Sequence, residues 1–379
     1  MVFNSKAGLF NFISKKTPKI HAGLDISPEG FTLVSLSIEK DKHGHNKKGG
    51  DYFLETFACK NFKEEILQNG MITKPDIFAE SLKEILEKNN FNIKTVNVCI
   101  SSSNMFIKTL TFPSLPMEEL KIIAPQEVSK HIPFTINEIN VDFEILEKTS
   151  KENKVDVILC ALSKTIAKNI VETIAKAGLE VESIDVSSFA MIKTLANAEM
   201  INNPDLTYIS VLIGYENTDI NIIKNGMPVF SHNTQAGKKN IVEAIIKSFE
   251  TNREEAEKRL PALGLVLPGM ETSANPDLHK ASNATRSIYS NIASEIQKAI
   301  EFYNSQSNEN TKIEKIILGG CGVCIQNIDK YISNKLKIQT ELCDSLKNIS
   351  HNLEISENLI SPVNIPALST SIGLALKGY

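Results

Sequence analysis

The sequence has no excess of positive charge and no long apolar run. Its formal net charge is −4 at pH 7, which provides no basic field for a nucleic acid, and it carries no strongly acidic tail. No apolar stretch reaches the roughly 18 residues that a membrane-spanning helix needs. The 379 residues, 42% hydrophobic and 23% charged, are instead typical of a globular protein with two domains or four small subdomains.

Cysteine is scarce and scattered. Several cysteines lie inside apolar strands, as reduced thiols do in cytosolic proteins. Two of them form a Cys-x-x-Cys pair, but it lacks both the second ligand pair of a zinc site and the βαβ setting of a thioredoxin-like motif, so we interpret it as packing. The six cysteines are Cys59, Cys99, Cys160, Cys321, Cys324 and Cys343.

The first 19 residues mix aromatic and aliphatic side chains with lysines. The apolar stretch is too broken for a secretion signal, and no small-residue cleavage site follows it. Two interpretations remain open: a basic tail, and a short amphipathic segment that lies on an anionic membrane surface.

Two strand–turn–strand patterns lie about half a chain apart, at residues 20–36 and 208–223. In each, an apolar strand enters a short polar turn and a second strand follows. Such turns aim backbone N–H groups and small hydroxyls at one point, which suits phosphate oxygens. A third apolar strand, Ile313–Leu318, precedes a glycine-rich turn. This layout is that of the nucleotide fold shared by actin, sugar kinases and heat-shock chaperones.

Residues 106–186 form a separate pattern of strand, helix, two strands and helix, which predicts a compact α+β unit. The first helix is predicted over 117–131, with a kink or a division into two short helices at Pro125. In the second half, a helix is predicted from Gly237. Residues 251–289 show little apolar periodicity and are predicted to be partly irregular.

Taken in order, these segments resemble the type IV pilus assembly protein PilM family, a relative of the cell-division actin homologue FtsA. The resemblance covers nearly the whole chain, and the proline-bracketed stretch with the Ile-Pro-Phe sequence after it is its specific part. The matching segments are Gly23-Leu-Asp-Ile26, Leu110–Leu120, His131-Ile-Pro-Phe134, Ala177-Gly-Leu-Glu180, Asp185, Phe189-Ala190, Glu254-Glu-Ala-Glu257, Ile317-Leu-Gly-Gly320 and Ile372–Gly378.

The resemblance implies an α/β protein with the actin-like (ribonuclease H-like), two-lobed ATPase fold and an inserted α+β subdomain of the 1C type. Residues 1–19 are then an N-terminal tail. The rest divides into subdomain 1A (20–105, 187–206 and 365–379), subdomain 1C (106–186), subdomain 2A (207–239 and 311–364) and subdomain 2B (240–310).

The resemblance also implies a cytoplasmic scaffold of the pilus assembly platform, peripheral on the inner membrane through its partners. In that family a groove between the inserted module and the first subdomain holds the short N-terminus of the membrane protein PilN. The implied partners are a PilN-like protein and the platform and motor proteins, with no nucleic acid. An extended peptide in such a groove uses main-chain pairing and side-chain pockets. The predicted peptide-binding residues are Leu115, Met117, Leu120 and Ile123.

ATP and Mg²⁺ are the cofactors that the resemblance implies, in the cleft between the lobes. Asp25 stands where the family has its first-turn acid and is predicted to face the metal or its waters. Lys238 and Lys239 are either phosphate ligands or solvated. The other predicted cofactor-binding residues are Ser27, Gly214, Thr218, Gly237, Gly319, Gly320 and Gly322.

The chain departs from the family pattern at two acids. Leu212 stands in place of an aspartate that holds a metal-bound water, and Ser187 in place of a glutamate that orients the attacking water. Phosphoryl transfer depends on positioning and charge stabilisation, and each lost group costs roughly 10²-fold in rate. The hypothesis is weak or structural nucleotide binding with very slow hydrolysis, so no catalytic residue is assigned. The alternatives are an active ATPase or small-molecule kinase, an FtsA-like filament protein, and a type II secretion or competence scaffold.

Overall fold

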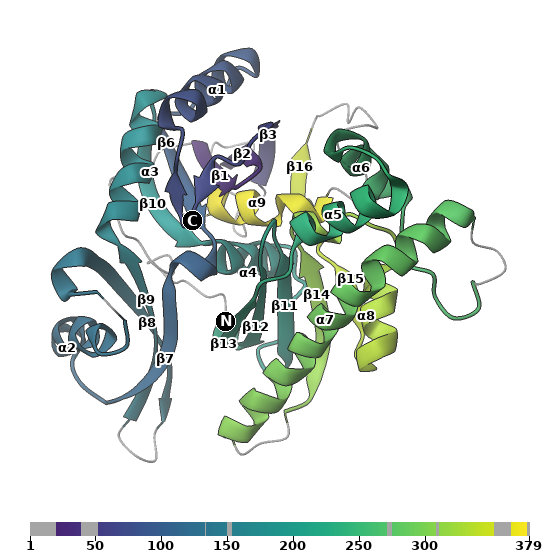
Figure 1. Ribbon diagram of the computed structural model, residues 1–379. Helices are drawn as coiled ribbons and strands as arrows, with labels where there is room; N and C mark the ends of the chain where they lie inside the picture. Colours follow the sequence, from purple (N-terminus) through teal and green to yellow (C-terminus); the bar gives the residue numbers. More distant parts are fainter. Residues whose placement is uncertain are drawn as a thin grey trace, which may run out of the picture. The chain divides into compact units, whose positions relative to one another are not determined.

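The computed structural model describes residues 20–38, 52–132, 134–149, 154–270, 275–307, 311–351 and 365–376 (Figure 1). The expected tail at 1–19 lies outside these ranges. The chain divides into two compact units. Unit 1 comprises Met1–Thr194, Asn348–Asn352 and Thr370–Tyr379, and unit 2 comprises Leu195–Lys347 and Leu353–Ser369.

The main sheet of unit 1 has six strands in the order β10-β6-β1-β2-β3-β16. Strands β1, β2 and β3 form an antiparallel meander, β6 and β10 run parallel to β1, and β16 runs parallel to β3. Strand β6 is buried along almost its whole length, as parallel strands covered on both faces are. The strands are β1 (Ile20–Ser27), β2 (Gly30–Ile38), β3 (Tyr52–Asn61), β6 (Thr95–Ile100), β10 (Glu180–Val186) and β16 (Ile349–His351).

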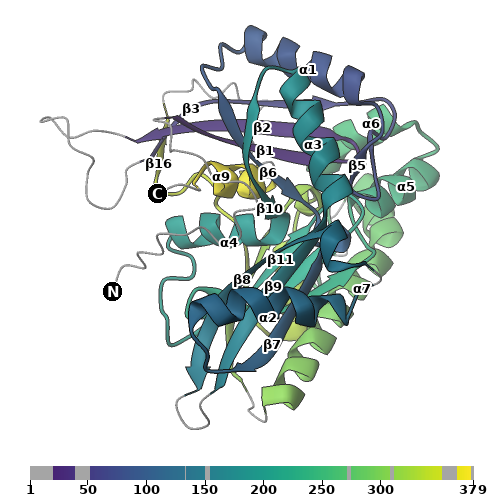
Figure 2. The ribbon, with the colours of Figure 1, turned by 90° about the vertical axis from the view of Figure 1, so that its left-hand side faces the viewer.

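Two helices of unit 1 lie side by side, α1 (Pro75–Lys88) and α3 (Lys164–Lys176), as Figure 2 shows. An ion pair joins Lys176 Nζ to Asp76 Oδ1 at 2.6 Å. The side chain of Asn169 in α3 bonds both backbone groups of Ile72, at 2.7 and 3.2 Å, in the small hairpin β4 (Leu67–Gln68) and β5 (Met71–Ile72). These contacts attach α3 to the body of unit 1.

The strands β7 (Phe106–Pro113), β8 (Ile139–Thr149) and β9 (Lys154–Ser163) form an antiparallel sheet with β9 in the centre. Helix α2 (Met117–Ser129) lies along this sheet (Figure 2) and buries Leu120, Ala124 and Val128. Two short turns, η1 (Ser102–Asn104) and η2 (Ile136–Glu138), precede β7 and β8. We call this three-stranded sheet with α2 the inserted module.

Helix α2 is continuous through Pro125, so the predicted division into two short helices is wrong. A proline removes only one i→i−4 hydrogen bond. Here Leu120 and Val128, on either side of it, are both anchored in the core of the module, which holds the helix together.

Unit 2 contains a five-stranded sheet in the order β13-β12-β11-β14-β15. Its meander β11-β12-β13 is flanked by the parallel strands β14 and β15, which repeats the β1-β2-β3 meander flanked by β6 and β10 in unit 1. The strands are β11 (Thr207–Ile213), β12 (Thr218–Lys224), β13 (Met227–Thr234), β14 (Ile313–Gly319) and β15 (Thr340–Leu342).

Six helices of unit 2 in the described ranges share the core of this sheet, which consists of aliphatic residues and Tyr289. They are α5 (Lys238–Phe249), α6 (Arg253–Arg259), η3 (Leu260–Ala262), α7 (Pro276–Ser307), η4 (Cys321–Val323) and α8 (Ile328–Leu336). The short turn η5 (Ile365–Leu368) contacts η4 and β14. Among the helices of the described ranges, none is long and apolar enough to cross a membrane.

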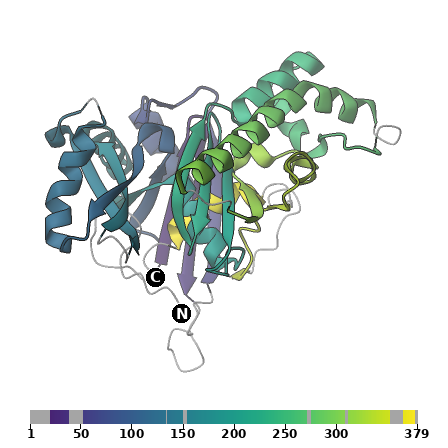
Figure 3. The ribbon, with the colours of Figure 1, turned by 90° about the horizontal axis from the view of Figure 1, so that it is seen from below.

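Helix α7 runs unbroken from Pro276 to Ser307 (Figure 3), so the irregular structure predicted up to residue 289 is wrong there. Its first turns bury small and polar side chains, which leave no apolar stripe in the sequence. Thr285 Oγ1 donates to the carbonyl of Ala281 at 2.9 Å, and Ser282 Oγ accepts the N–H of Val266 at 3.0 Å. These bonds satisfy the hydroxyls and allow their burial.

The boundary between the units falls inside α4 (Ser187–Asn197) and α9 (Ser369–Ala375). The unit 1 part of α9 packs closely there: a Cβ on Gly23 would lie 2.0 Å from the carbonyl oxygen of Ser371. Asn97 Nδ2 donates to the carbonyl of Leu374 at 3.1 Å, and Leu374 packs with Cys99. The last segment of the chain therefore completes the core of unit 1.

Candidate functional site

The first turn joins β1 to β2 through two residues, since Ser27 pairs with Gly30. The Ser27 hydroxyl donates to the Gly30 carbonyl at 3.3 Å. The carbonyls of Pro28 and Glu29 accept hydrogen bonds from residues 66 and 62, at 3.0 and 2.8 Å. The turn is therefore fixed from one side by the chain that follows β3.

Three polar or ionisable side chains stand in register at the carboxyl ends of neighbouring strands. Asp25 of β1 lies opposite Cys99 of β6, which lies opposite Asp185 of β10. Cys99 Sγ donates to Asp25 Oδ1 at 3.1 Å. Burial raises the pKa of Asp25 to about 6, the Cys99 hydrogen bond lowers it, and the nearby charge of Glu29 raises it. Asp25 thus combines a fixed orientation with an easily protonated carboxylate.

Asp185 is fully buried and has its own counter-ion. Its Oδ2 lies 2.8 Å from Lys193 Nζ of α4, and its Oδ1 accepts the N–H of Val186 at 2.8 Å. Ser187, the residue that replaces the family's glutamate, hydrogen-bonds the Cys99 thiol. Burial and the Asp25 charge raise the pKa of that thiol, which keeps it protonated.

The second turn joins β11 to β12 through residues 214–217. The Gly214 N–H donates to the Asn217 carbonyl at 2.8 Å and closes the turn. Thr218 is fully buried, and its Oγ1 donates to the Ala236 carbonyl at 2.6 Å. The Thr218 hydroxyl proton is therefore directed to the protein backbone.

The start of α5 packs directly on this turn. The amides of Lys238 and Lys239 donate to the carbonyls of Gly214 and Tyr215, at 2.9 and 2.8 Å. A Cβ on Gly237 would lie only 2.4 Å from the Tyr215 oxygen. Packing alone thus requires glycine at 237, and protein carbonyls occupy two amides that a phosphate would otherwise bind.

Charged side chains around the second turn pair with one another. Lys239 Nζ lies 3.1 Å from Glu216 Oε1, within the turn itself. Arg253 donates to the Tyr215 hydroxyl at 2.7 Å and to Glu257 at 2.9 Å. The structure contains an ion pair for Lys239, which is neither of the two predicted roles, phosphate ligand or solvated side chain.

Leu212 is buried at the end of β11, where the family has an acid. Directly opposite it, on β12, lies Asp219, whose Oδ1 accepts from Asn233 Nδ2 at 2.6 Å. The sequence analysis did not single out this carboxylate. The available signal was its position directly after Thr218, at the start of the strand that follows the turn. The strands at the second turn therefore provide one carboxylate, on β12, and an apolar side chain on β11. The carboxylate is able to hold a metal-bound water, whereas the leucine is not.

The glycine-rich turn after β14 packs against the end of β11. Gly320 has φ +90°, and a Cβ there would lie 2.4 Å from the Ile213 carbonyl oxygen. A Cβ on Gly322 would lie 2.2 Å from Ile213 Cγ2. Gly319, the last residue of β14, lies opposite Leu212. The glycine-rich turn and the end of β11 that leads into the second turn thus meet around Ile213.

The inserted module carries the predicted peptide-binding residues, but not all lie at its surface. Leu120 is fully buried under α2, so its side chain belongs to the core rather than to a contact surface, which corrects the prediction for this residue. Leu115 and Ile123 are half-buried, and Met117 is 48% exposed.

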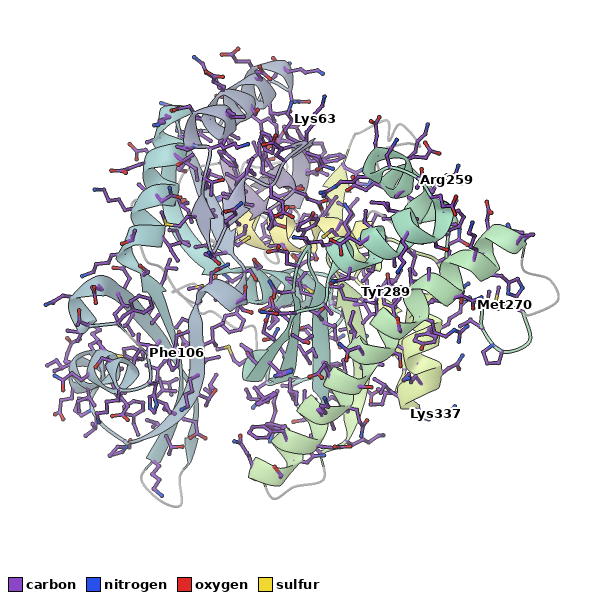
Figure 4. The ribbon with its side chains drawn as sticks, in the orientation of Figure 1. Lys63, Phe106, Arg259, Met270, Tyr289 and Lys337 are labelled. Carbon is purple, nitrogen blue, oxygen red and sulfur yellow. The ribbon has the colours of Figure 1, made fainter. Side chains whose placement is uncertain are left out.

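Sequence reasoning missed three exposed apolar side chains of the same region: Ile122, Phe134 and Ile136. Helical spacing was the available signal for the first. Ile122 is two residues from Leu120, which places it about 200° around the helix and away from the core. Phe106, labelled in Figure 4, stacks on His131 beyond the end of α2, with 6.3 Å between ring centroids.

Groups of three or more His, Cys, Asp or Glu side chains that could hold a metal ion do not occur in the described part of the chain. Asp25 lies on β1 before the first turn and Asp219 lies on β12 after the second turn, one in each unit.

Two units with the same strand order, each with a turn after its first strand, define an actin-like protein. The chain belongs to a family within that class: the family model described as type IV pilus assembly protein PilM matches residues 23–379. The cell division protein FtsA of Streptococcus pneumoniae serotype 2 (strain D39 / NCTC 7466) is 23% identical over 260 residues. That match covers 62% of this chain and 54% of FtsA, so the chain spans about half the length of this relative.

Solved structures agree with this fold. The chain is similar to a structure described as the PilM-PilN type IV pilus biogenesis complex, with a TM-score of 0.79, 22% identity, and coverage of 95% of this chain and 99% of that one. It is also similar to MreB5 of Spiroplasma citri bound to AMPPNP, with a TM-score of 0.50, 14% identity, and coverage of 88% and 94%. The predicted actin-like α/β fold is confirmed.

Proposed function

We propose that this chain is a cytoplasmic scaffold of the pilus assembly platform that binds the N-terminal segment of a PilN-like inner-membrane protein. The family match supports the pilus assembly role. The partner is inferred from the similar structure, which holds PilM with PilN. Association with the inner membrane, and with platform and motor proteins, then follows from the partner.

The observation that carries the peptide-binding proposal is the distribution of exposed apolar side chains. Six large hydrophobic side chains are exposed in the described ranges, and four of them lie between residues 117 and 136. These four are Met117, Ile122, Phe134 and Ile136, with exposed fractions of 48, 63, 46 and 42%. Such a concentration on one small module marks an interaction surface, whereas isolated exposed hydrophobics are ordinary.

The four side chains follow α2 from its first residue to the turn beyond its end. A helix of 13 residues is about 20 Å long, which matches about six residues of extended peptide. Leu115 and Ile123, both half-buried, line the same segment. We call these six residues the α2 surface and propose that an extended apolar segment binds to part of it.

Peptide titration tests this proposal. A synthetic peptide with the N-terminal sequence of the PilN-like protein is titrated into the full chain and into Met117→Glu and Ile122→Glu variants. Each variant is expected to weaken binding at least tenfold, or about 1.4 kcal/mol. Ile77→Glu is the matched control, since Ile77 is 50% exposed on α1 of the same unit. Equal affinities in all four proteins would move the site elsewhere.

We further infer that the chain binds Mg-ATP weakly and hydrolyses it very slowly. Asp25 and Ser27 of the first turn, and Gly214, Thr218, Gly319, Gly320 and Gly322 of the second half, are the proposed contacts. Gly237 has a sufficient explanation in packing and contributes indirectly, by holding α5 on the turn. Leu212 and Ser187 replace the two acids that would position waters, which removes the charge stabilisation on which fast transfer depends.

Nucleotide binding and turnover are separable by experiment. Calorimetric titration with ATP is expected to show Mg²⁺-dependent binding that Asp25→Asn weakens, while Mg²⁺-free binding is unchanged. Release of inorganic phosphate is expected to stay far below that of an active kinase-fold ATPase measured beside it. Phosphate release as fast as that of the active enzyme would contradict slow hydrolysis. A calorimetric titration with ATP and Mg²⁺ that shows no binding heat would contradict nucleotide binding.

The subdomain division stays part of this proposal. In it, subdomain 1C is residues 106–186, 1A is 20–105, 187–206 and 365–379, 2A is 207–239 and 311–364, and 2B is 240–310.

A further inference from the structure

Cys321 and Cys324 lie at the two ends of one short turn. Cys321 is the first residue of η4, and Cys324 is the residue that ends it. Side chains three residues apart in a 3₁₀ turn lie one above the other, and three residues rise about 6 Å. Disulfide-bonded cysteines have Cα atoms about 4.4–6.8 Å apart, and the Cα separation expected for such a turn falls within this range.

Three contacts fix the backbone at the first cysteine and between the two cysteines. The Gly320 N–H donates to the Pro366 carbonyl of η5 at 2.9 Å. Gly322 packs on Ile213 of β11. The hydroxyl of Tyr289, a fully buried residue of α7 labelled in Figure 4, donates to the Gly322 carbonyl at 3.0 Å. A turn held in this way loses little conformational freedom when its two side chains are joined.

Both thiols are reduced and partly exposed to solvent. Three of the other cysteines, Cys99, Cys160 and Cys343, are buried. Burial raises the pKa of each of these thiols, which keeps them protonated and unreactive. Cys59 is exposed on β3, where its Sγ accepts a hydrogen bond from Thr32 Oγ1 at 3.4 Å and no second cysteine lies within three residues in the sequence. The pair in η4 therefore differs from the other four cysteines in combining access with a neighbour.

We propose that Cys321 and Cys324 form a redox-active dithiol, which a low-molecular-weight disulfide oxidises to an intrachain disulfide. The thiolate of one cysteine attacks the oxidant's S–S bond, forms a mixed disulfide and releases one thiol. The second cysteine, as its thiolate, attacks the protein sulfur of that mixed disulfide and releases the second thiol. Two protein thiols and one small disulfide thus give one protein disulfide and two small thiols.

Oxidation of the folded full chain by glutathione disulfide tests this site. After oxidation, free thiols are blocked with N-ethylmaleimide and the chain is digested with trypsin. Cleavage after Lys315 and Lys330 gives one peptide that contains both cysteines and no other. The expected result is a peptide lighter by two hydrogen atoms, with neither maleimide nor glutathione attached, that returns to the doubly blocked form when dithiothreitol is added before blocking.

Three variants sharpen the measurement. Cys59→Ser is the matched control and is expected to leave disulfide formation unchanged. Cys321→Ser and Cys324→Ser are expected to leave the remaining cysteine blocked by maleimide or joined to glutathione. Two blocked thiols in the oxidised wild-type peptide, or glutathione on both, would overturn the proposal. The wild-type result needs no variant to fold and does not depend on peptide or nucleotide binding.

Discussion

At the scale of single residues, the hydrogen bonding and the pKa of Asp25 depend on a neighbour that is distant in sequence. Its thiol partner Cys99 is 74 positions away and meets it only through the parallel pairing of β1 with β6. The acid itself was predictable from its turn, whereas its hydrogen bond and raised pKa were not, because no local pattern encodes the register between two strands.

The raised pKa of Asp25 predicts a pH-dependent stability. Its pKa rises from 3.8 to about 6 on folding, so the folded chain binds the extra proton between these values. This contribution to stability is complete below about pH 4 and is lost as the pH rises through 6. Asp25→Asn, which carries no charge, should stabilise the protein at pH 7.5 by about 1–3 kcal/mol.

Urea unfolding of the wild type and Asp25→Asn at pH 4.5 and 7.5 measures this difference. The gain should shrink at the lower pH, where the wild-type carboxyl is protonated. An equal difference at both pH values would show that charge is not its cause.

Gly320 and Gly269 form a matched pair of glycines. Both have positive φ, +90° and +89°, but a Cβ meets backbone only at Gly320 and open space at Gly269. Gly269→Ala should therefore cost about 1–2 kcal/mol of backbone strain. Gly320→Ala should cost more, because the backbone of Ile213 must also move. Thermal unfolding of the two variants compares them, and equal losses would contradict the packing argument.

At the scale of elements, helix α2 divides its aliphatic residues between core and surface. Leu120→Ala should destabilise the chain by about 2–4 kcal/mol, because it leaves a cavity in the core of the module. Ile122→Ala should change stability by no more than about 0.5 kcal/mol, since that side chain is 63% exposed. Guanidinium unfolding curves of both variants measure these changes in the free energy of unfolding. A larger loss of stability for Ile122→Ala than for Leu120→Ala would contradict the assignment of Leu120 to the core and Ile122 to the surface.

Most elements were predictable because their apolar residues recur at a helix or strand period. The ends of helix α3 carry local signals as well. At its start the Ser163 hydroxyl accepts the Thr165 N–H, and after its end Gly178 has φ +85°. The first half of α7 was not predictable, because Ser282 and Thr285 are buried through hydrogen bonds to backbone that is distant or a turn away. Periodicity detects apolar burial and not satisfied hydroxyls.

At the scale of the whole molecule, unit 1 is assembled from three separate stretches of chain. Strand β16 and most of α9 follow unit 2 in sequence but belong to unit 1. Leu374 packs with Cys99 and Ala190, and a Cβ on Gly373 would lie 1.8 Å from the Ala190 carbonyl oxygen. The early part of the chain therefore has an incomplete core when it stands alone.

A fragment ending at Thr194 should consequently fail to unfold cooperatively. Adding a synthetic peptide of residues 365–379 should restore part of the transition, which circular dichroism during urea titration follows. The control is a peptide with the same sequence except for Leu374→Asp. Cooperative unfolding of the fragment alone, at the midpoint of the full protein, would contradict the prediction.

The late position of α9 has a consequence for biosynthesis. While the ribosome is still translating unit 2, the β1 and β6 strands are already outside the exit tunnel, but the helix that covers Gly23 and Asn97 does not yet exist. Nascent chains normally fold domain by domain from the N-terminus. Unit 1 is unable to fold completely in this order, because α9 is translated last. Translation that stops early therefore yields chains whose hydrophobic surface beneath α9 is uncovered. Chaperones and proteases recognise such surfaces, which keeps incomplete chains from competing with intact ones.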